Sequence, residues 1–347
     1  MSIVYTETYW QDVKKVADQI PGLSEIYNKT VLVTGGTGMI CSTVAEILFY
    51  LNNFQDAGIT ILLAGRDKQR VCNRFYCFDE GKDYQFIQYD ATCNQKLDVD
   101  VDYIIHGASN ANPQVYVKQP VETMLSNIVG LNCLLDLAKR KHCKRVLYIS
   151  SSEVYGIKKE ERAYVEDDYG FVDILNARAC YPNSKRTAET LCIAYREEYK
   201  VNTVIVRPGH IYGPTITDID SRASAQFTRN AMKGQDIIMK SEGNQLRSYC
   251  YTLDCASAIL TVLLNGEIGN AYNISNKNSV ITIRELAETF ARVSKSKVVY
   301  ENATDFEKKG YNLMENSALN AEKLEALGWR AHFDVLEGVS KTICMLK

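Results

Sequence analysis

From Val31 onward, short apolar segments of strand length alternate with longer segments of helical periodicity. The predicted strands are Val31–Thr34, Ile59–Ala64, Gln85–Tyr89, Tyr103–His106, Val146–Ser150 and Val204–Arg207. The predicted helices between them are Ile40–Tyr50, Val121–Arg140 and Tyr181–Tyr199. Strands that alternate with helices favour βαβ units, and therefore predict an α/β fold with a parallel, doubly wound sheet.

The segments on either side of this pattern predict two additions to the sheet. Residues 1–29 are expected to form a helical extension, because Trp10, Val13, Val16 and Ala17 recur at helical spacing before the break at Pro21–Gly22. Residues 30–214 would hold the sheet. Beyond Pro214 the pattern breaks into shorter segments, so residues 215–347 are predicted to form mainly a smaller C-terminal lobe. Its predicted helices are Ala223–Lys233, Leu253–Leu264 and Thr282–Val293.

Composition excludes several classes of protein. The 347 residues carry a formal net charge of -2 with both signs interspersed, which predicts no nucleic-acid partner. The apolar runs are shorter than a membrane span, and the first residues do not resemble a signal peptide. Eleven cysteines and four histidines have no metal-ligand spacing, so we expect no metal site and small, buried cysteines in a reducing compartment. A cytoplasmic protein with no membrane partner is predicted.

The turn TGGTGMI at Thr34–Ile40 follows a predicted strand and opens a predicted helix. Glycines in that position allow a tight turn and let a pyrophosphate approach the helix N-terminus. Gly35 and Gly38 hold the first two glycine positions of such a turn, and Cys41 stands where a third would be. A structural turn would look the same, but the strand–turn–helix context favours a Rossmann-like dinucleotide site.

The end of the second predicted strand bears on the choice of dinucleotide. NAD sites have an acidic residue there for the ribose hydroxyls, whereas an arginine suits the 2′-phosphate of NADP. This chain has Gly65 at the acidic position, followed by Arg66 and Asp67. Arg66 favours NADP and Asp67 leaves NAD open, although both would also fit a solvated loop. Asp90, after the next strand, is predicted either to contact adenine or to stabilise a turn.

The segment CYPNSKR contains Tyr181 and Lys185, which are four residues apart and share one face of a helix. An ammonium beside a phenol favours the phenolate, so Lys185 is expected to lower the pKa of Tyr181. A phenolate can take a proton from an alcohol while hydride leaves the same carbon for a nicotinamide. The pair therefore predicts an enzyme that oxidises an alcohol.

Five segments together resemble the extended short-chain dehydrogenase/reductase family. In chain order they are TGGTGMI, IIHGASNAN, YISSSEVYG, CYPNSK and VRPGHIYGP. Members of this family are mainly NAD(P)-dependent nucleotide-sugar epimerases, 4,6-dehydratases and decarboxylases. The resemblance implies that Tyr181 and Lys185 are the base and its partner and that Ser151 orients the sugar O4. It also implies a homodimer through the helices Val121–Arg140 and Tyr181–Tyr199. The implied cofactor-site residues are Gly35, Thr37, Gly38, Met39, Ile40, Arg66, Asp67, Asp90, Ala91, Ala108, Ser109 and Pro208.

The tripeptide Ser151-Ser152-Glu153, which completes the predicted catalytic set, separates the three reactions. All of them begin by oxidising C4 of the sugar. A 4-epimerase needs no further acid or base, whereas a 4,6-dehydratase needs both. In glucose dehydratases the pattern at these positions resembles Thr-Asp-Glu. Ser152 replaces that aspartate. The pattern is similar to that of UDP-glucuronate decarboxylases, although GDP-mannose dehydratases share Ser-Glu and Glu153 would also fit a strand end that bonds the backbone.

Four residues are predicted to contact the substrate by the same resemblance. Arg178, in RACYPNSKR, and Arg222, in DSRASAQF, match segments of the decarboxylases, with Arg222 expected on the nucleotide side. Arg247 matches an arginine near the diphosphate or the sugar carboxylate, for which a guanidinium fork is suited. His210 stands where many relatives have an asparagine that contacts the diphosphate. Structural roles remain the alternatives: a surface ion pair for Arg247 and a core position for His210.

The sequence thus favours decarboxylation of a UDP-glucuronate-like substrate. A nucleotide-sugar 4-epimerase is the first alternative and a 4,6-dehydratase the second. A non-catalytic dinucleotide-binding regulator should have lost the catalytic set, yet Ser151, Tyr181 and Lys185 are all present.

Overall fold

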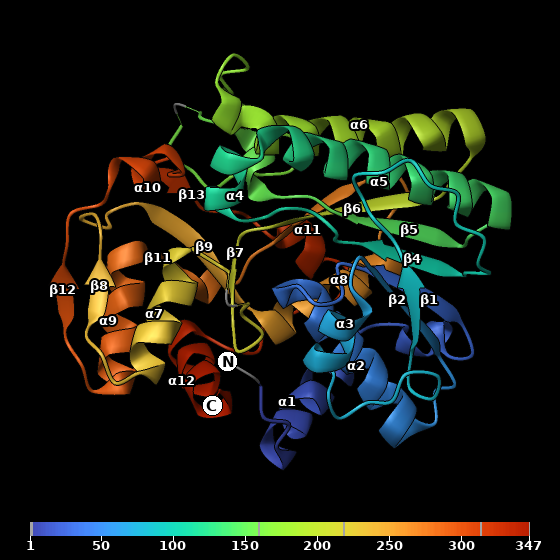
Figure 1. Ribbon diagram of the computed structural model, residues 1–347, viewed down its shortest axis with the longest axis horizontal. Helices are drawn as coiled ribbons and strands as arrows, with labels where there is room; N and C mark the ends of the chain where they lie inside the picture. The colour runs from blue at the N-terminus through green and yellow to red at the C-terminus, as the bar shows by residue number, and fades with distance from the viewer. Residues whose placement is uncertain (1–2, 159, 218, 313, 347) are drawn as a thin grey trace.

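A parallel sheet of seven strands forms the centre of the computed structural model, which describes residues 3–158, 160–217, 219–312 and 314–346 (Figure 1). The order is β10-β6-β5-β4-β1-β2-β3, and every neighbouring pair is parallel. The strands are β1 (Thr30–Thr34), β2 (Thr60–Gly65), β3 (Gln85–Gln88), β4 (Tyr103–His106), β5 (Arg145–Ile149), β6 (Thr203–Pro208) and β10 (Ala271–Ile274). The predicted α/β fold is confirmed, and β10 adds a strand that was not predicted.

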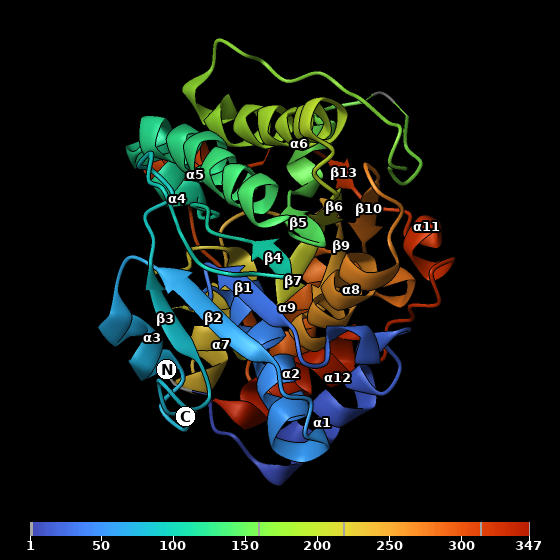
Figure 2. The same ribbon diagram turned by 90° about the vertical axis from the view of Figure 1, so that its right-hand side faces the viewer.

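Helices cover both faces of this sheet, as Figure 2 shows. α5 (Pro120–Lys141) and α6 (Cys180–Tyr199) pack on one face, while α2 (Met39–Gln55) and α8 (Thr252–Asn265) pack on the other. Successive strand residues point to opposite faces, so Val31 and Val33 join the core beside α2, and Leu32 joins the core beside α5. A sheet buried on both faces explains why its strands read as continuous apolar runs.

Of the helices in the described parts of the chain, α5 alone is long and apolar enough by length and composition to cross a membrane. In the structure, 56% of its most apolar window is buried, against α6 and the sheet. A packed core helix meets the same criteria.

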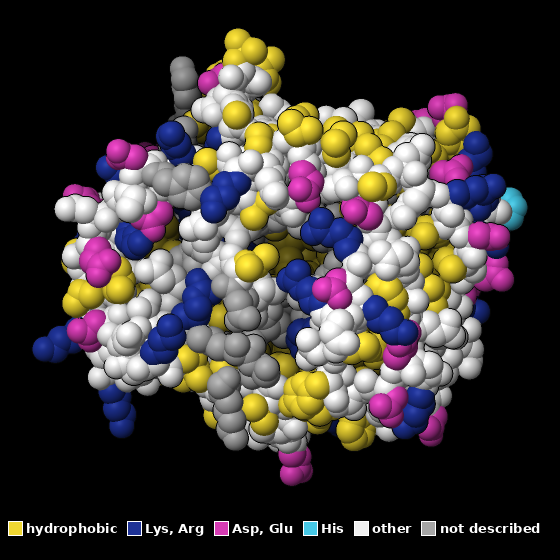
Figure 3. Space-filling view, viewed as in Figure 1, with side chains coloured by type: hydrophobic (Ala, Val, Ile, Leu, Met, Phe, Trp, Pro, Cys, Tyr) yellow, Lys and Arg dark blue, Asp and Glu magenta, His cyan; other side chains and the backbone are white. Residues whose placement is uncertain are grey.

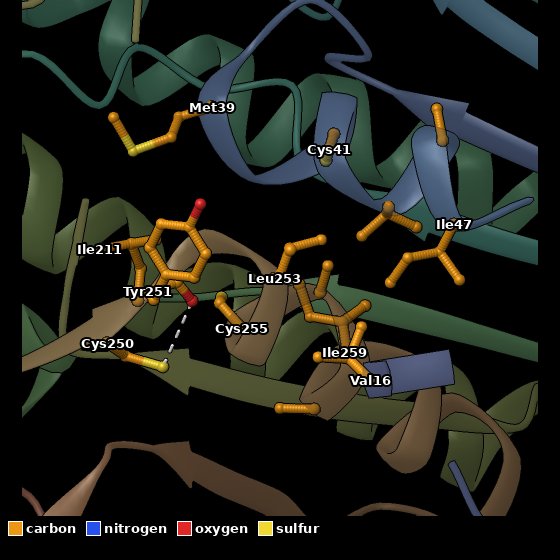
Figure 4. Close-up of a cluster of buried hydrophobic side chains, with 14 of the residues drawn as sticks. Val16, Met39, Cys41, Ile47, Ile211, Cys250, Tyr251, Leu253, Cys255 and Ile259 are labelled. Atoms are coloured by element: carbon orange, nitrogen blue, oxygen red, sulfur yellow. Dashed lines mark hydrogen bonds between the residues drawn. The ribbon is translucent and has the colours of Figure 1, made fainter. Parts of the chain in front are cut away.

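Cysteines contribute to the core between the sheet and its helices. Cys41 of α2 and Cys255 of α8 lie in the apolar cluster of Figure 4, together with Val16, Leu253 and Ile259. All eleven cysteines are free thiols, and seven are buried. The prediction of small core cysteines holds for those seven, whereas Cys72, Cys77, Cys93 and Cys344 are partly or fully exposed.

Residues from His210 onward, apart from α8 and β10, build a smaller lobe beside the carboxyl ends of the sheet strands (Figure 1). Its strands are β7 (His210–Tyr212), β8 (Ile237–Met239), β9 (Leu246–Tyr251), β11 (Val280–Thr282), β12 (Val298–Tyr300) and β13 (Asn316–Ser317). Its helices are α7 (Ala223–Met232), α9 (Ile283–Ser294), α10 (Asp305–Lys309), α11 (Glu322–Glu325) and α12 (Val335–Met345). The predicted boundary at residue 214 does not separate the two parts cleanly, because α8 and β10 return to the main sheet.

The N-terminal extension is a packed part of this core. Its helix α1 (Glu7–Ala17) is capped by Thr6 and contacts α2 and α8. The fully buried carboxylate of Glu46 on α2 accepts hydrogen bonds from the hydroxyls of Tyr5 and Tyr9 and from Arg74 of α3 (Lys68–Arg74). An ion pair of Asp12 with Lys341, 2.7 Å, fastens α1 to α12.

Candidate active site

The glycine-rich turn lies between β1 and α2, against the end of β4. Gly35 has φ 70°, and a Cβ built there would lie 2.8 Å from the carbonyl oxygen of Gly107. A Cβ on Gly107 would lie 2.3 Å from Sγ of Cys41. Glycine is therefore required at both positions by close approach, and at Gly35 also by the left-handed backbone. Cys41, at the third glycine position, fills the space beneath the turn.

A cleft of about 480 Å³ runs from this turn across the carboxyl ends of β1, β2 and β4. Figure 3 shows a hollow in the middle of this face with Lys and Arg side chains around it. Ten of the twelve predicted cofactor residues line the cleft: Gly35, Thr37, Gly38, Met39, Arg66, Asp67, Asp90, Ala91, Ala108 and Ser109. Ile40 and Pro208 line a second cavity of about 200 Å³ that shares several wall residues with it.

These walls fit a dinucleotide. The N-terminus of α2 at Gly38 has no side-chain cap, so its backbone N–H groups are free to hold an anion. Two polar groups that line the cleft are buried and have no hydrogen-bond partner: the hydroxyl of Ser109 and the side-chain amide nitrogen of Asn110. Such groups are satisfied by a polar ligand.

The far end of the cleft carries the residues predicted to read the adenosine. The carboxylate of Asp67 caps α3 by accepting from the backbone N–H of Arg70, 3.0 Å, and is occupied there. Nη1 of Arg66 donates to Oε1 of Glu122 at 3.2 Å. Glu122 also lines the cleft and was not among the predicted residues. Burial alone would raise the pKa of Asp90, but hydrogen bonds from the backbone and hydroxyl of Thr92 lower it.

The predicted catalytic residues meet in the second cavity. Ser151, Ser152 and Glu153 follow β5, with Ser152 opening a short 3₁₀ helix (Ser152–Tyr155), and all three line this cavity with Tyr181 and Lys185. Tyr116 of α4 (Pro113–Lys118) stacks on the Tyr181 ring with centroids 4.5 Å apart and planes at 14°. Only the tertiary fold brings Tyr116 to this place, so no sequence signal identified it.

The electrostatics of Tyr181 differ from the prediction. Burial and the charge of Glu153 raise its pKa, while the Ser151 hydroxyl, Arg222 and Tyr116 act in the opposite direction. Nζ of Lys185 instead donates to the carbonyl of Ile149, 2.7 Å, and lies 5.7 Å from the centre of the Tyr181 ring. The expected lowering of the phenol pKa by Lys185 is therefore wrong for this structure, because burial outweighs the nearby cations.

The four predicted substrate residues have different surroundings. Arg222 lines both cavities where they meet and is paired with Asp220, 2.6 Å, rather than lying on the nucleotide side alone. His210 lines the second cavity with Nδ1 buried and unpartnered, and burial, with Arg247 and Arg222, lowers its pKa to about 3. Arg178 lies behind Glu153 and binds it in a two-fold ion pair.

Arg247 does not reach either cavity. Its Nη1 donates to the backbone carbonyls of Leu246, 2.9 Å, and Glu315, 3.3 Å, and the side chain is buried among the strands of the lobe. The expectation that Arg247 contacts a diphosphate or sugar carboxylate is not supported by this arrangement. Asn312, which was not predicted, lines the second cavity instead.

Comparison with known proteins identifies the class. Residues 31–275 match the NAD dependent epimerase/dehydratase family, and the chain belongs to it. UDP-glucuronic acid decarboxylase 6 of Arabidopsis thaliana is 30% identical over 328 residues, covering 90% of this chain and 87% of the relative. UDP-glucuronic acid decarboxylase 1 of Xenopus tropicalis is 29% identical over 322 residues, covering 92% and 73%. The chain is therefore an NAD-dependent enzyme of the epimerase, dehydratase and decarboxylase class.

Solved structures agree on the fold. Epimerase Mth375 from Methanothermobacter thermautotrophicus superposes with a TM-score of 0.78 at 20% identity, covering 95% of this chain and 94% of that chain. A UDP-glucuronic acid 4-epimerase from Bacillus cereus, in complex with UDP-glucuronic acid and NAD, gives 0.75 at 19% identity, covering 91% and 98%.

The burial of Lys185 predicts a pH-dependent effect on stability. Burial lowers its pKa from 10.5 to about 7, whereas the unfolded chain keeps the ordinary value. Between these values the unfolded chain binds more protons, so this group makes the free energy of unfolding rise with pH. We expect Lys185→Met to be more stable than the wild type at pH 7, by about 1–3 kcal/mol, and the gain to shrink towards about pH 9.5.

Urea unfolding at both pH values, followed by circular dichroism, measures this difference. A variant that is less stable than the wild type by the same amount at both pH values would contradict the assigned burial of the ammonium.

Proposed function

We propose that this chain decarboxylates a UDP-glucuronate-like sugar nucleotide, with the sugar bound in the second cavity. The observation that carries the proposal is the meeting of Tyr181, Ser151 and Glu153 in a cavity that shares its wall with the dinucleotide cleft. Relatives named UDP-glucuronic acid decarboxylases, which match nine tenths of the chain, support the choice of substrate.

In this proposal Tyr181 takes the proton from the sugar O4 while the Ser151 hydroxyl holds that oxygen. When bound in the cleft, oxidised NAD would supply the acceptor for the hydride that leaves C4. The resulting ketone is β to the C6 carboxylate. The C5–C6 bond then breaks, its electron pair passes into the C4 carbonyl, and carbon dioxide leaves. A proton is added at C5, which leaves the C4 ketone of a pentose. The hydride would then return to C4 while Tyr181 gives the proton back to O4, and no acid at the position of Ser152 is needed.

A 4-epimerase acting on the same sugar is the second candidate. The Bacillus cereus neighbour is a UDP-glucuronic acid 4-epimerase of the same fold, and epimerisation needs no residue beyond the catalytic set. A 4,6-dehydratase is disfavoured because Ser152 cannot serve as the acid that its reaction requires.

We propose NAD as the resident cofactor, with NADP admitted by the adenosine end of the cleft. NAD complexes among the structural neighbours support the first, while Gly65, Arg66 and the occupied carboxylate of Asp67 support room for a 2′-phosphate. Fluorescence titration of the cofactor-free protein with NAD and NADP, repeated on Arg66→Asp, separates the two. The substitution should weaken NADP about tenfold and change NAD little. Equal losses for both would exclude a role in selecting the phosphate.

We also propose that the chain forms a homodimer through α5 and α6. Val121, Met124 and Leu125 expose large apolar side chains on the first turns of α5, and Tyr199 does so at the end of α6. Sedimentation velocity should give twice the mass of 39.2 kDa, and Leu125→Arg should shift the protein towards the monomer. A monomeric wild type at micromolar concentration would rule this interface out.

The reaction itself is tested by incubation with UDP-glucuronate and mass analysis of the sugar nucleotide. Loss of carbon dioxide is expected. Tyr181→Phe should lower turnover about 10³-fold and leave cofactor binding intact, because it removes only the proton acceptor. An unchanged mass with altered configuration at C4 would favour the epimerase, and full turnover by Tyr181→Phe would remove the assigned base.

A further inference from the structure

Glu153, in the wall of the second cavity, forms a two-fold ion pair with Arg178. Nη1 of Arg178 donates to Oε2 of Glu153 at 2.8 Å, and Nη2 donates to Oε1 at 2.9 Å. The side chain of Glu153 is 18% exposed and that of Arg178 is 15% exposed. A guanidinium matched to both oxygens of a carboxylate, and largely withheld from water, fixes both charge and orientation.

Arg178 approaches Glu153 from behind the cavity wall. It lies in a short 3₁₀ turn (Ala177–Ala179) directly before α6, and it does not line the cavity itself. Its guanidinium is 5.1 Å from the centre of the Tyr116 ring, which in turn stacks on Tyr181. Arg178 therefore contacts two residues of the cavity wall, Glu153 and Tyr116.

The charges around the second cavity make this pair consequential. Among the described residues that line it, Glu153 is the only carboxylate. Three further cations act near the cavity. Arg222 is already paired with Asp220, Arg247 lies outside the wall and donates to backbone carbonyls, and burial lowers the pKa of Lys185 to about 7. In a uronic acid sugar whose O4 meets Tyr181, the carboxylate carbon C6 is only two carbon–carbon bonds from C4, so it stays in the cavity whose wall contains Glu153. An uncompensated Glu153 would repel a carboxylate placed there.

We propose that Arg178 is a positioning residue that compensates the charge of Glu153, so that the cavity accepts the carboxylate of a uronic acid sugar. The inference rests on the proposed function and adds a determinant of substrate class to it.

Arg178 is not needed to hold helix α6 against the segment that carries Glu153, because another residue makes that connection. Arg186 of α6 donates to the backbone carbonyls of Val154, 2.6 Å, Tyr155, 3.2 Å, and Gly170, 2.9 Å, and so ties the helix to the segment that carries Glu153. The connection between these two elements does not depend on Arg178, which leaves the carboxylate of Glu153 as its main partner.

The test compares two ligands that differ only at C6: UDP-glucuronate, with a carboxylate, and UDP-glucose, with a neutral hydroxymethyl group. Both are titrated calorimetrically into the NAD-loaded protein at neutral pH, in a Tyr181→Phe background so that turnover does not consume the ligand. Arg178→Met should weaken UDP-glucuronate about tenfold or more, because Glu153 is left unpaired. It should weaken UDP-glucose less than about threefold.

Two further variants separate charge from structure. Arg178→Lys keeps the charge without the fork and should recover part of the loss, whereas Glu153→Gln combined with Arg178→Met should restore UDP-glucuronate binding. Arg162→Met is the matched control, since Arg162 forms a similar two-fold pair with Asp168 outside both cavities. It should leave both affinities unchanged.

Equal weakening of both ligands by Arg178→Met, or no rescue in the double variant, would overturn the inference and leave decarboxylation standing. A Tyr181→Phe protein that binds neither ligand, together with a wild type that does not turn over UDP-glucuronate, would overturn the proposed function and this inference with it.

Discussion

The close approach of the glycine-rich turn to the end of β4 determines where both cavities lie. With no Cβ on Gly35 or Gly107, the turn rests directly on the neighbouring backbone, and Sγ of Cys41 occupies the remaining space. The N-terminus of α2 then opens onto the cleft without a side-chain cap. Met39, at that N-terminus, borders both cavities, so the geometry of one turn sets how a dinucleotide and a sugar would face each other.

The periodicity of the sequence was sufficient to predict the sheet as far as β6. β10 was missed because Ala271–Ile274 follows a region whose helices belong partly to the lobe and partly to the sheet. The pairing of β10 with β6 is set by the tertiary fold and not by the local sequence. The boundary at residue 214 was drawn where the pattern changed, although α8 returns to the sheet beyond it.

The candidate site was predictable where the chemistry is local. Spacing placed Tyr181 and Lys185 on one helix face, but it could not show that Lys185 would donate to Ile149 or that burial would dominate both groups. Arg178, the partner of Glu153, lies 25 residues further along the chain. No sequence pattern predicts that the loop between them brings Arg178 back to Glu153. Arg247 illustrates the opposite error, since its match to a motif gave no information about which way its side chain points.

The second cavity combines paired charges with buried groups whose charged forms are disfavoured by burial. Glu153 and Arg222 each have a partner, and burial lowers the pKa values of Lys185 to about 7 and His210 to about 3. Such surroundings solvate a carboxylate less well than water does, and they favour its departure as neutral carbon dioxide once the C4 ketone is formed. The chemistry proposed here therefore depends more on burial than on additional acids or bases.

The most direct measurement is the reaction of the wild-type chain with UDP-glucuronate in D₂O, with the product analysed by NMR and mass spectrometry. Oxidation at C4, loss of C6 and return of the hydride to C4 predict a pentose sugar nucleotide that carries one deuterium at C5. A product that keeps its carboxylate and is inverted at C4 would contradict decarboxylation as the activity of this site.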